Sequence, residues 1–267
     1  MSLIEEYNLI MNNLPVDFKN LYNNLTSLKT IDEIIINEPI MNINCFLSMI
    51  SNVYLINKLT ILNNPDNQLS LLLDAFKHVD IDKLIIKNIK NIKDFNNIVW
   101  FLSKNTSIKY IDLSNNNLKN IDDFLISLMH NTSLKELNLS NNNISDIYYM
   151  TEAFKFNKNI KHINLSNNQI EYIDSLDDLI GNNIIEELDV SNNNINDICD
   201  VLDYYRKNTS LKKFNLCNNN LNDESLELLN DTKFLNKNDD YDDINEDESI
   251  DKIIEIRDFN IHDYIHK

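Results

Sequence analysis

Ten polar or aromatic residues recur in pairs at a fixed spacing, and they are the side chains best placed to bind a ligand. One residue separates the members of each pair, and successive pairs are 25 or 26 residues apart. The pairs are Tyr110 and Asp112, Glu136 and Asn138, His162 and Asn164, Glu187 and Asp189, and Lys213 and Asn215. Residues two apart on a β-strand point to the same side. We therefore expect a partner-binding surface with Tyr110 and His162 as amphipathic anchors; the alternative is that these are solvated strand positions.

Other reactive residues do not combine into a recognisable catalytic or metal site. His162 could approach a metal ion together with Glu136 and Asp189, but such a set contains one histidine and no cysteine. The remaining histidines are scattered: His78, His130, His262 and His266. A single glycine, Gly181, is too few for a loop that cradles phosphate groups. We predict no catalysis, no metal and no cofactor.

Composition narrows the kind of partner. The formal net charge of −18 disfavours nucleic acid, whose binding depends on clustered lysines and arginines, and favours a protein with a basic surface. Cys45, Cys199 and Cys217 are too far apart for a zinc site or a disulfide framework and indicate reduced thiols. Residues 1–7 lack a basic signal region, and no apolar run is long enough to span a membrane. We expect a monomer in the cytoplasm or nucleus that is not secreted.

The elements that position these pairs belong to an internal repeat. Offsets are counted from the first apolar residue of each copy; apolar residues fall at offsets 0, 3, 5 and 10, and asparagine falls at offset 8. Five copies match in full, beginning at Ile108, Leu134, Ile160, Ile185 and Leu211. Weaker copies begin at Ile31, Ile56 and Ile81, which makes eight repeats, and a ninth strand is possible at Ile254 and Ile256.

The pattern LxxLxLxxNxL resembles the leucine-rich-repeat family. Residues Asn105–Ile108, Asn131–Leu134 and Asn208–Leu211 open repeats after a helical pattern and resemble the ribonuclease-inhibitor-type class, although that class has longer repeats and a glycine after the asparagine motif. The resemblance implies an α/β solenoid, a right-handed superhelix shaped as a horseshoe, with a parallel inner sheet, helices on the convex side and partners bound on the concave face. Asn105, Asn131 and Asn208 also begin glycosylation motifs, but their recurrence indicates helix-to-strand turns.

Each part of the repeat has a physical role. Offsets 3 and 5 alternate with period 2 and predict a short strand, whereas residues such as Phe124, Leu125 and Leu128 follow a helical period. Asparagine at offset 8 supplies both a donor and an acceptor where the chain leaves the sheet, so a stacked ladder is expected. The ladder residues are Asn116, Asn142, Asn168, Asn193 and Asn219.

The ends of the chain differ from the repeats. Residues 1–30 predict two amphipathic helices that cap residues 31–235, which hold the repeats. Residues 236–249 are acidic and predict a mobile loop or linker, and residues 250–267 predict a C-terminal cap. The early repeats place Ile35, Thr60, Leu62 and Ile85 on the inner face, which indicates an interface, coverage by the cap or a different register.

Two further functions compete with a simple binding scaffold. One class of leucine-rich-repeat protein regulates small GTPases and also carries an acidic tail, but the only arginines here are Arg206 and Arg257. A ubiquitin-ligase adaptor would require residues 14–25 to be the remnant of an F-box, and this segment is short for that module. A purely structural role is a further alternative.

Overall fold

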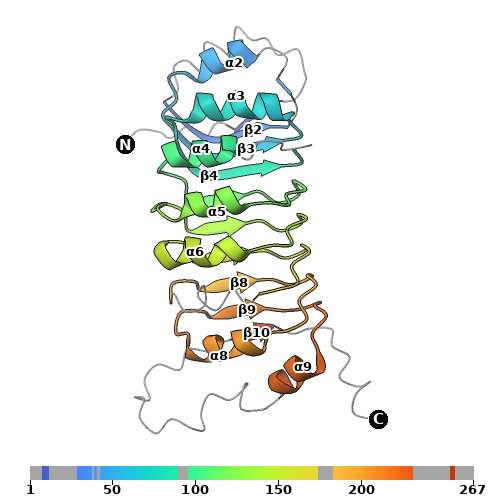
Figure 1. Ribbon diagram of the computed structural model, residues 1–267. Coiled ribbons are helices and arrows are strands. Elements are labelled where there is room, and N and C mark those ends of the chain that lie inside the picture. The colour runs from blue at the N-terminus through green and yellow to red at the C-terminus, as the bar shows by residue number, and fades with distance from the viewer. Residues whose placement is uncertain are drawn as a thin grey trace.

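The computed structural model describes residues 8–11, 29–37, 39–40, 43–89, 96–173, 183–230 and 253–255. The strands form one parallel sheet in which neighbours in sequence are neighbours in space, so the sheet runs from β1 to β10 without closing (Figure 1). The strands are β1 (Asn8–Met11), β2 (Thr30–Ile36), β3 (Leu55–Leu62), β4 (Asp80–Lys87), β5 (Tyr110–Asp112), β6 (Glu136–Asn138), β7 (His162–Asn164), β8 (Glu187–Asp189), β9 (Lys213–Asn215) and β10 (Ile253–Glu255). This is the predicted solenoid.

Helices connect consecutive strands and form a second layer. They are α2 (Ile43–Ile50), α3 (Asp66–Phe76), α4 (Asn96–Lys104), α5 (Asp122–Leu128), α6 (Tyr148–Phe156), α8 (Cys199–Lys207) and α9 (Asp223–Asn230). Helix α3 contacts α4, α4 contacts α5, and α5 contacts α6, so these helices are stacked along the sheet (Figure 1); α8 likewise contacts α9. A strand, a turn and a helix therefore make one repeat, and each repeat is stabilised by its neighbours.

The core lies between the sheet and the helices and follows the repeat template. All residues at offsets 0, 3, 5 and 10 of the five full copies are buried, as are those at offsets 0, 3 and 5 of the three weaker copies. Offset 3 forms a continuous row in which Ile111 pairs with Leu137, and Leu137 with Ile163. Burying one such side chain contributes about 1.5–3 kcal/mol, and a single repeat buries few of them alone. Stacking is therefore what makes the repeat stable.

The N-terminal prediction was wrong over residues 8–11, where the structure has a strand in place of a helix. Strand β1 pairs with β2 in parallel, and Leu9 and Met11 lie opposite the buried Ile34 and Ile36. The chain thus extends the strand pattern one step before Ile31. The run Leu9-Ile10-Met11 is apolar throughout, so its periodicity did not distinguish helix from strand.

At the other end, the strand expected near Ile254 is β10, which pairs with β9. The other end-region predictions lie outside the described residues: residues 1–7 and 12–28 of the N-terminal cap, the acidic segment 236–249, and most of residues 250–267. Most of the helix expected at Ile173–Ile180 also lies outside them, as does the part of the last helix beyond Asn230.

Candidate functional site

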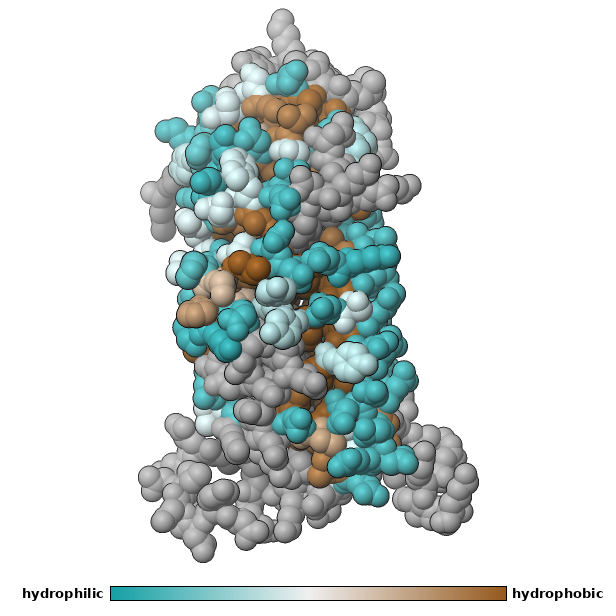
Figure 2. Space-filling model, in the orientation of Figure 1, coloured by the Kyte–Doolittle hydropathy of each residue, from teal (hydrophilic) through white to brown (hydrophobic). Residues whose placement is uncertain are grey.

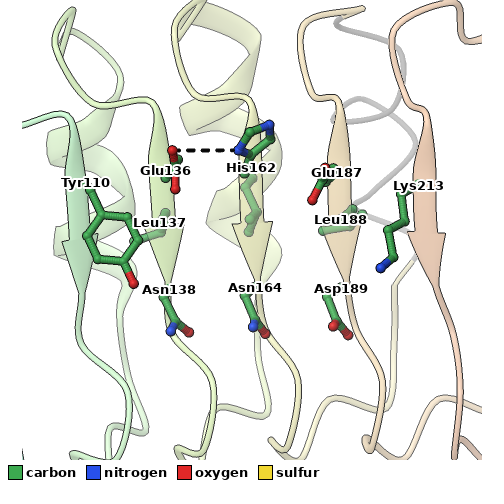
Figure 3. Close-up of a pocket in the computed structure, with 11 residues that line it drawn as sticks. Tyr110, Glu136, Leu137, Asn138, His162, Asn164, Glu187, Leu188, Asp189 and Lys213 are labelled. Carbon is green, nitrogen blue, oxygen red and sulfur yellow. Dashed lines mark ion pairs between the residues drawn. The ribbon is translucent and has the colours of Figure 1, made fainter.

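The ten paired residues identified in the sequence form two straight columns on the sheet. Offset 2 gives Tyr110, Glu136, His162, Glu187 and Lys213, and offset 4 gives Asp112, Asn138, Asn164, Asp189 and Asn215. We name this surface the open sheet face. Figure 3 shows residues of both columns side by side on adjacent strands. Eight of the ten line a shallow hollow of about 210 Å³, and only Asp112 and Asn215 do not.

The offset 4 column has a structural role. The Asn164 side-chain oxygen accepts from the backbone N–H of Ser166 at 2.9 Å and from its hydroxyl at 2.7 Å. Each of the other four members also accepts from the N–H two residues later: Asp112, Asn138, Asp189 and Asn215. These are Asx turns that end the strand. The preference for Asn and Asp at offset 4 is therefore explained without a ligand.

Asp112 is not available to a partner. It is 3% exposed, and the Lys87 ammonium lies 2.7 Å from its carboxylate. The Tyr110 hydroxyl lies 3.3 Å from the same carboxylate oxygen. Burial, followed by the negative charge of Asp112, raises the pKa of Tyr110 above its ordinary value of 10.0. Tyr110 is therefore a neutral, partly buried aromatic group at one end of the hollow.

The offset 2 column contains the accessible charges. Glu136 Oε1 lies 4.0 Å from His162 Nδ1, and both side chains are more than a third exposed. Among the described residues, neither Glu136 nor Glu187 has a lysine or arginine within ion-pair distance, whereas Glu33 in the same column pairs with Lys58 at 2.7 Å. The hollow therefore presents two carboxylates that form no ion pair with a lysine or arginine in the described part of the chain, although Lys213 lies one strand from Glu187.

The asparagine ladder residues lie between consecutive repeats and are buried. The Asn168 side-chain nitrogen donates to the carbonyl of Leu165 at 2.9 Å and to that of Leu139, in the preceding repeat, at 3.1 Å. Its oxygen accepts from the N–H of Ile144 at 3.0 Å. The remaining carboxamides bridge repeats in the same manner: Asn116, Asn142, Asn193 and Asn219.

The first member of this series is incomplete. Asn64 donates to the carbonyls of Leu62 and Ile36, but its buried oxygen has no hydrogen-bond donor among the described residues. The residue at offset 8 of the preceding repeat is Pro39, which has no N–H group. Nearby, the Gln68 side chain forms two hydrogen bonds of 2.9 Å with the backbone N–H and carbonyl of Ile40, and these stabilise the turn.

A second asparagine position escaped the sequence analysis. Seven residues at offset 7 have positive φ angles between 53° and 60°: Asn63, Asn88, Asn115, Asn141, Asn167, Asn192 and Asn218. This left-handed region favours glycine and, after it, asparagine. The two consecutive asparagines in Ser-Asn-Asn have different roles: the asparagine at offset 7 turns the chain, and the asparagine at offset 8 bridges the repeats. The signal was the scarcity of glycine in a chain with so many turns.

The expected helix-to-strand turns are also built on asparagine. The Asn208 side-chain oxygen accepts from the N–H groups of Ser210 and Leu211 at 2.8 and 2.6 Å. Asn105 donates to the carbonyl of Val79 at 2.7 Å, and Asn131 accepts from Leu134 at 2.8 Å. Asn105 and Asn208 are buried, so modification there would require the turn to open.

The early part of the sheet continues the offset 4 column with a different chemistry. Ile35, Thr60 and Ile85 lie in register there, and Ile85 pairs with Asp112, where the column becomes polar. Thr60 is buried, and the two isoleucines are partly buried. The predicted hydrophobic inner face is thus present in register, but it offers little exposed area.

Large exposed hydrophobic residues occur elsewhere, mainly on the helices. They include Leu71 on α3, Trp100 on α4, Ile126 on α5 and Tyr148 on α6. Figure 2 shows hydrophobic surface over α3 and α5 among hydrophilic side chains. The helical layer is therefore a second candidate docking surface beside the open sheet face.

The described residues contain neither a metal site nor a membrane-spanning helix. Within them, no group of three His, Cys, Asp or Glu side chains is arranged to hold a metal ion. No helix in that part of the chain is long and apolar enough to cross a membrane.

Comparison with known proteins agrees with the architecture. A family model for leucine-rich repeats in two copies matches residues 106–155 and 132–181, and a single-repeat model matches residues 181–198 and 207–229. No curated protein matches the chain. The fold and repeat length define a parallel β/α solenoid. The chain contains leucine-rich repeats over the matched residues, 106–198 and 207–229; the ribonuclease-inhibitor-type class remains a prediction.

Solved structures with a similar fold include two internalins from Listeria monocytogenes. The internalin inlF has a TM-score of 0.51 and 19% identity, over 78% of this chain and 53% of the internalin chain. This chain therefore spans about half of that protein. Internalin C2 has a TM-score of 0.48 and 18% identity, over 76% of this chain and 77% of its own. At 19% identity, the likeness to the internalin inlF shows the fold alone.

Proposed function

We propose that this protein is a non-catalytic scaffold that binds another protein on the open sheet face, and that the partner presents a basic surface there. One observation carries the proposal. Glu136 and Glu187 lie in the hollow without a neutralising lysine or arginine among the described residues. A basic partner would gain favourable electrostatic contacts with them and would associate faster in the field of a chain with net charge −18.

The division of the sheet face into two columns supports the same proposal. Offset 4 is occupied by Asx turns, whereas the side chains at offset 2 vary in charge and shape from strand to strand. Leucine-rich-repeat proteins usually bind partners on this face, which agrees with the location. Variation at the exposed column allows one scaffold to be adapted to one partner.

The alternative functions have less support. The proposed F-box remnant at residues 14–25 and Arg257 lie outside the described residues, and the side chain of Arg206 on α8 is not described. Stimulation of GTP hydrolysis by a panel of small GTPases would establish the regulator. Co-purification of a ligase scaffold protein would establish the adaptor.

The test is proximity labelling in the source cell followed by charge reversal on the open sheet face. We expect the double variant Glu136→Lys and Glu187→Lys to lose its labelled partner. A matched control carries the same charge change at the exposed Glu171 and Glu227, which lie outside the sheet. The control should keep the partner. Retention of the partner by the first variant would contradict binding at this face.

A further inference from the structure

The carboxylates of Glu136 and Glu187 have a defined spacing. Glu136 is on β6 and Glu187 is on β8, with His162 between them on β7, and all three occupy offset 2 (Figure 3). Adjacent strands lie about 4.8 Å apart, so the two glutamates project from backbone positions about 9.6 Å apart. The column as a whole spans four such steps, from Tyr110 to Lys213, or about 19 Å.

This spacing matches one common element of protein structure better than another. In an α-helix, residues seven apart share a face and are separated by about 10.5 Å along the axis. A residue three or four positions after the first lies about 4.5–6 Å from it along the axis. In an extended strand, same-face residues repeat every 6.4–6.8 Å or so, which coincides with neither one strand step nor two. A helix laid across the strands can therefore place one residue over each of β6, β7 and β8.

We infer that the partner element is an α-helix lying along the offset 2 column, with lysine or arginine at two positions seven residues apart facing Glu136 and Glu187. This inference rests on the proposed function. The helix residue three or four positions after the first cation lies between the two cations and faces His162. At the Tyr110 end, the residue one turn beyond the first cation is apolar or basic, because it meets an aromatic ring that Lys83 already approaches at 6.0 Å.

The Lys213 end completes the pattern. Lys213 occupies the same column one strand beyond Glu187, so a basic residue is disfavoured one turn beyond the second cation. The helix therefore needs about thirteen residues to cover the column, since 19 Å corresponds to that length at 1.5 Å per residue. The positions that follow one another in steps of one turn are thus apolar or basic, basic, polar, basic and non-basic.

The test uses two synthetic helical peptides of the same composition. The matched peptide carries lysines seven residues apart, and its isomer carries them five residues apart, which places them on opposite sides of a helix. Binding to the full chain is measured by fluorescence anisotropy at low salt. We expect the isomer to bind about two- to fivefold more weakly, the effect of losing one exposed ion pair.

Variants of the chain give the second arm of the test. Glu136→Gln and Glu187→Gln should each weaken binding of the matched peptide about two- to fivefold. Binding of the isomer should be weakened by at most one of these two substitutions. The control Glu171→Gln should change neither. Equal binding of the two peptides, or no measurable binding of the matched one, would overturn the helix assignment. If the cellular partner were still lost from the charge-reversed double variant, the open sheet face would remain the docking surface and only this inference would fail.

Discussion

The side-chain oxygen of Asn142 accepts a hydrogen bond of 3.0 Å from the backbone N–H of Asn116, one repeat earlier. The same oxygen accepts from Leu118 at 3.0 Å, while the Asn142 nitrogen donates to carbonyls of both repeats. A single buried side chain thus joins two turns whose backbone groups have no sheet partner at that point. The ladder determines how consecutive repeats are held together at the end of each strand.

Replacing Asn168 with leucine should destabilise the protein by about 1–3 kcal/mol, because the change leaves buried backbone groups without partners. Asn194→Leu is the matched control, since Asn194 is exposed one residue after a ladder asparagine. The free energy of unfolding in urea is the measurement. An unchanged value for Asn168→Leu would contradict the role assigned to the ladder.

The left-handed turn at offset 7 should tolerate glycine and reject branched residues. Asn192 has a φ angle of 53°, and a β-branched side chain there would crowd the backbone. We expect Asn192→Gly to leave the melting temperature nearly unchanged and Asn192→Val to cost about 1–2 kcal/mol. Equal melting temperatures for the two variants would show that the backbone does not hold this conformation.

The Asx turns predict that Asn164 matters for folding more than for binding. Asn164→Ala removes the acceptor for both the N–H and the hydroxyl of Ser166 and should cost about 1 kcal/mol. Asn164→Asp keeps the acceptor and should cost less. Chemical denaturation of the two variants checks this order, and the reverse order would show that the side chain is not retained for the turn.

A charge cluster beside the open sheet face gives a pH-dependent term. Glu186 lies between Lys161 and Lys212, with Lys212 at 2.8 Å, and these cations lower its pKa from 4.5 to about 2. Because the folded pKa is the lower one, the stabilisation is complete above about pH 4.5 and disappears as pH falls towards 2. The lysines are half exposed or more, so the stabilisation is at most about 1 kcal/mol at neutral pH.

The variant Glu186→Gln tests this term when unfolding is followed from pH 7 to pH 3. The difference in stability between the parent chain and the variant should stay constant from pH 7 to about pH 5 and shrink as the pH falls further to 3. A difference that is constant over this range, or that grows in acid, would contradict the ion-pair origin.

Much of the architecture could be predicted because aliphatic residues such as Ile111 and Leu113 alternate with period 2 inside a regular repeat. Strand β1 could not, because Leu9, Ile10 and Met11 carry no period that separates strand from helix. The columns of the open sheet face followed from the same alternation. Their chemistry did not, because the pairing of Asp112 with Lys87 depends on the register between repeats and on local turns.

Two surfaces remain to be compared directly, the open sheet face and the exposed aromatic residues of the helical layer. A photo-crosslinking amino acid placed at His162, or at the exposed Tyr148 on α6, in the source cell reports which one touches the partner. Binding at the open sheet face predicts a specific covalent adduct from position 162 that is lost when Glu136 and Glu187 are changed to lysine, and no adduct with that partner from position 148. An adduct with that partner from position 148 alone would contradict binding at the open sheet face.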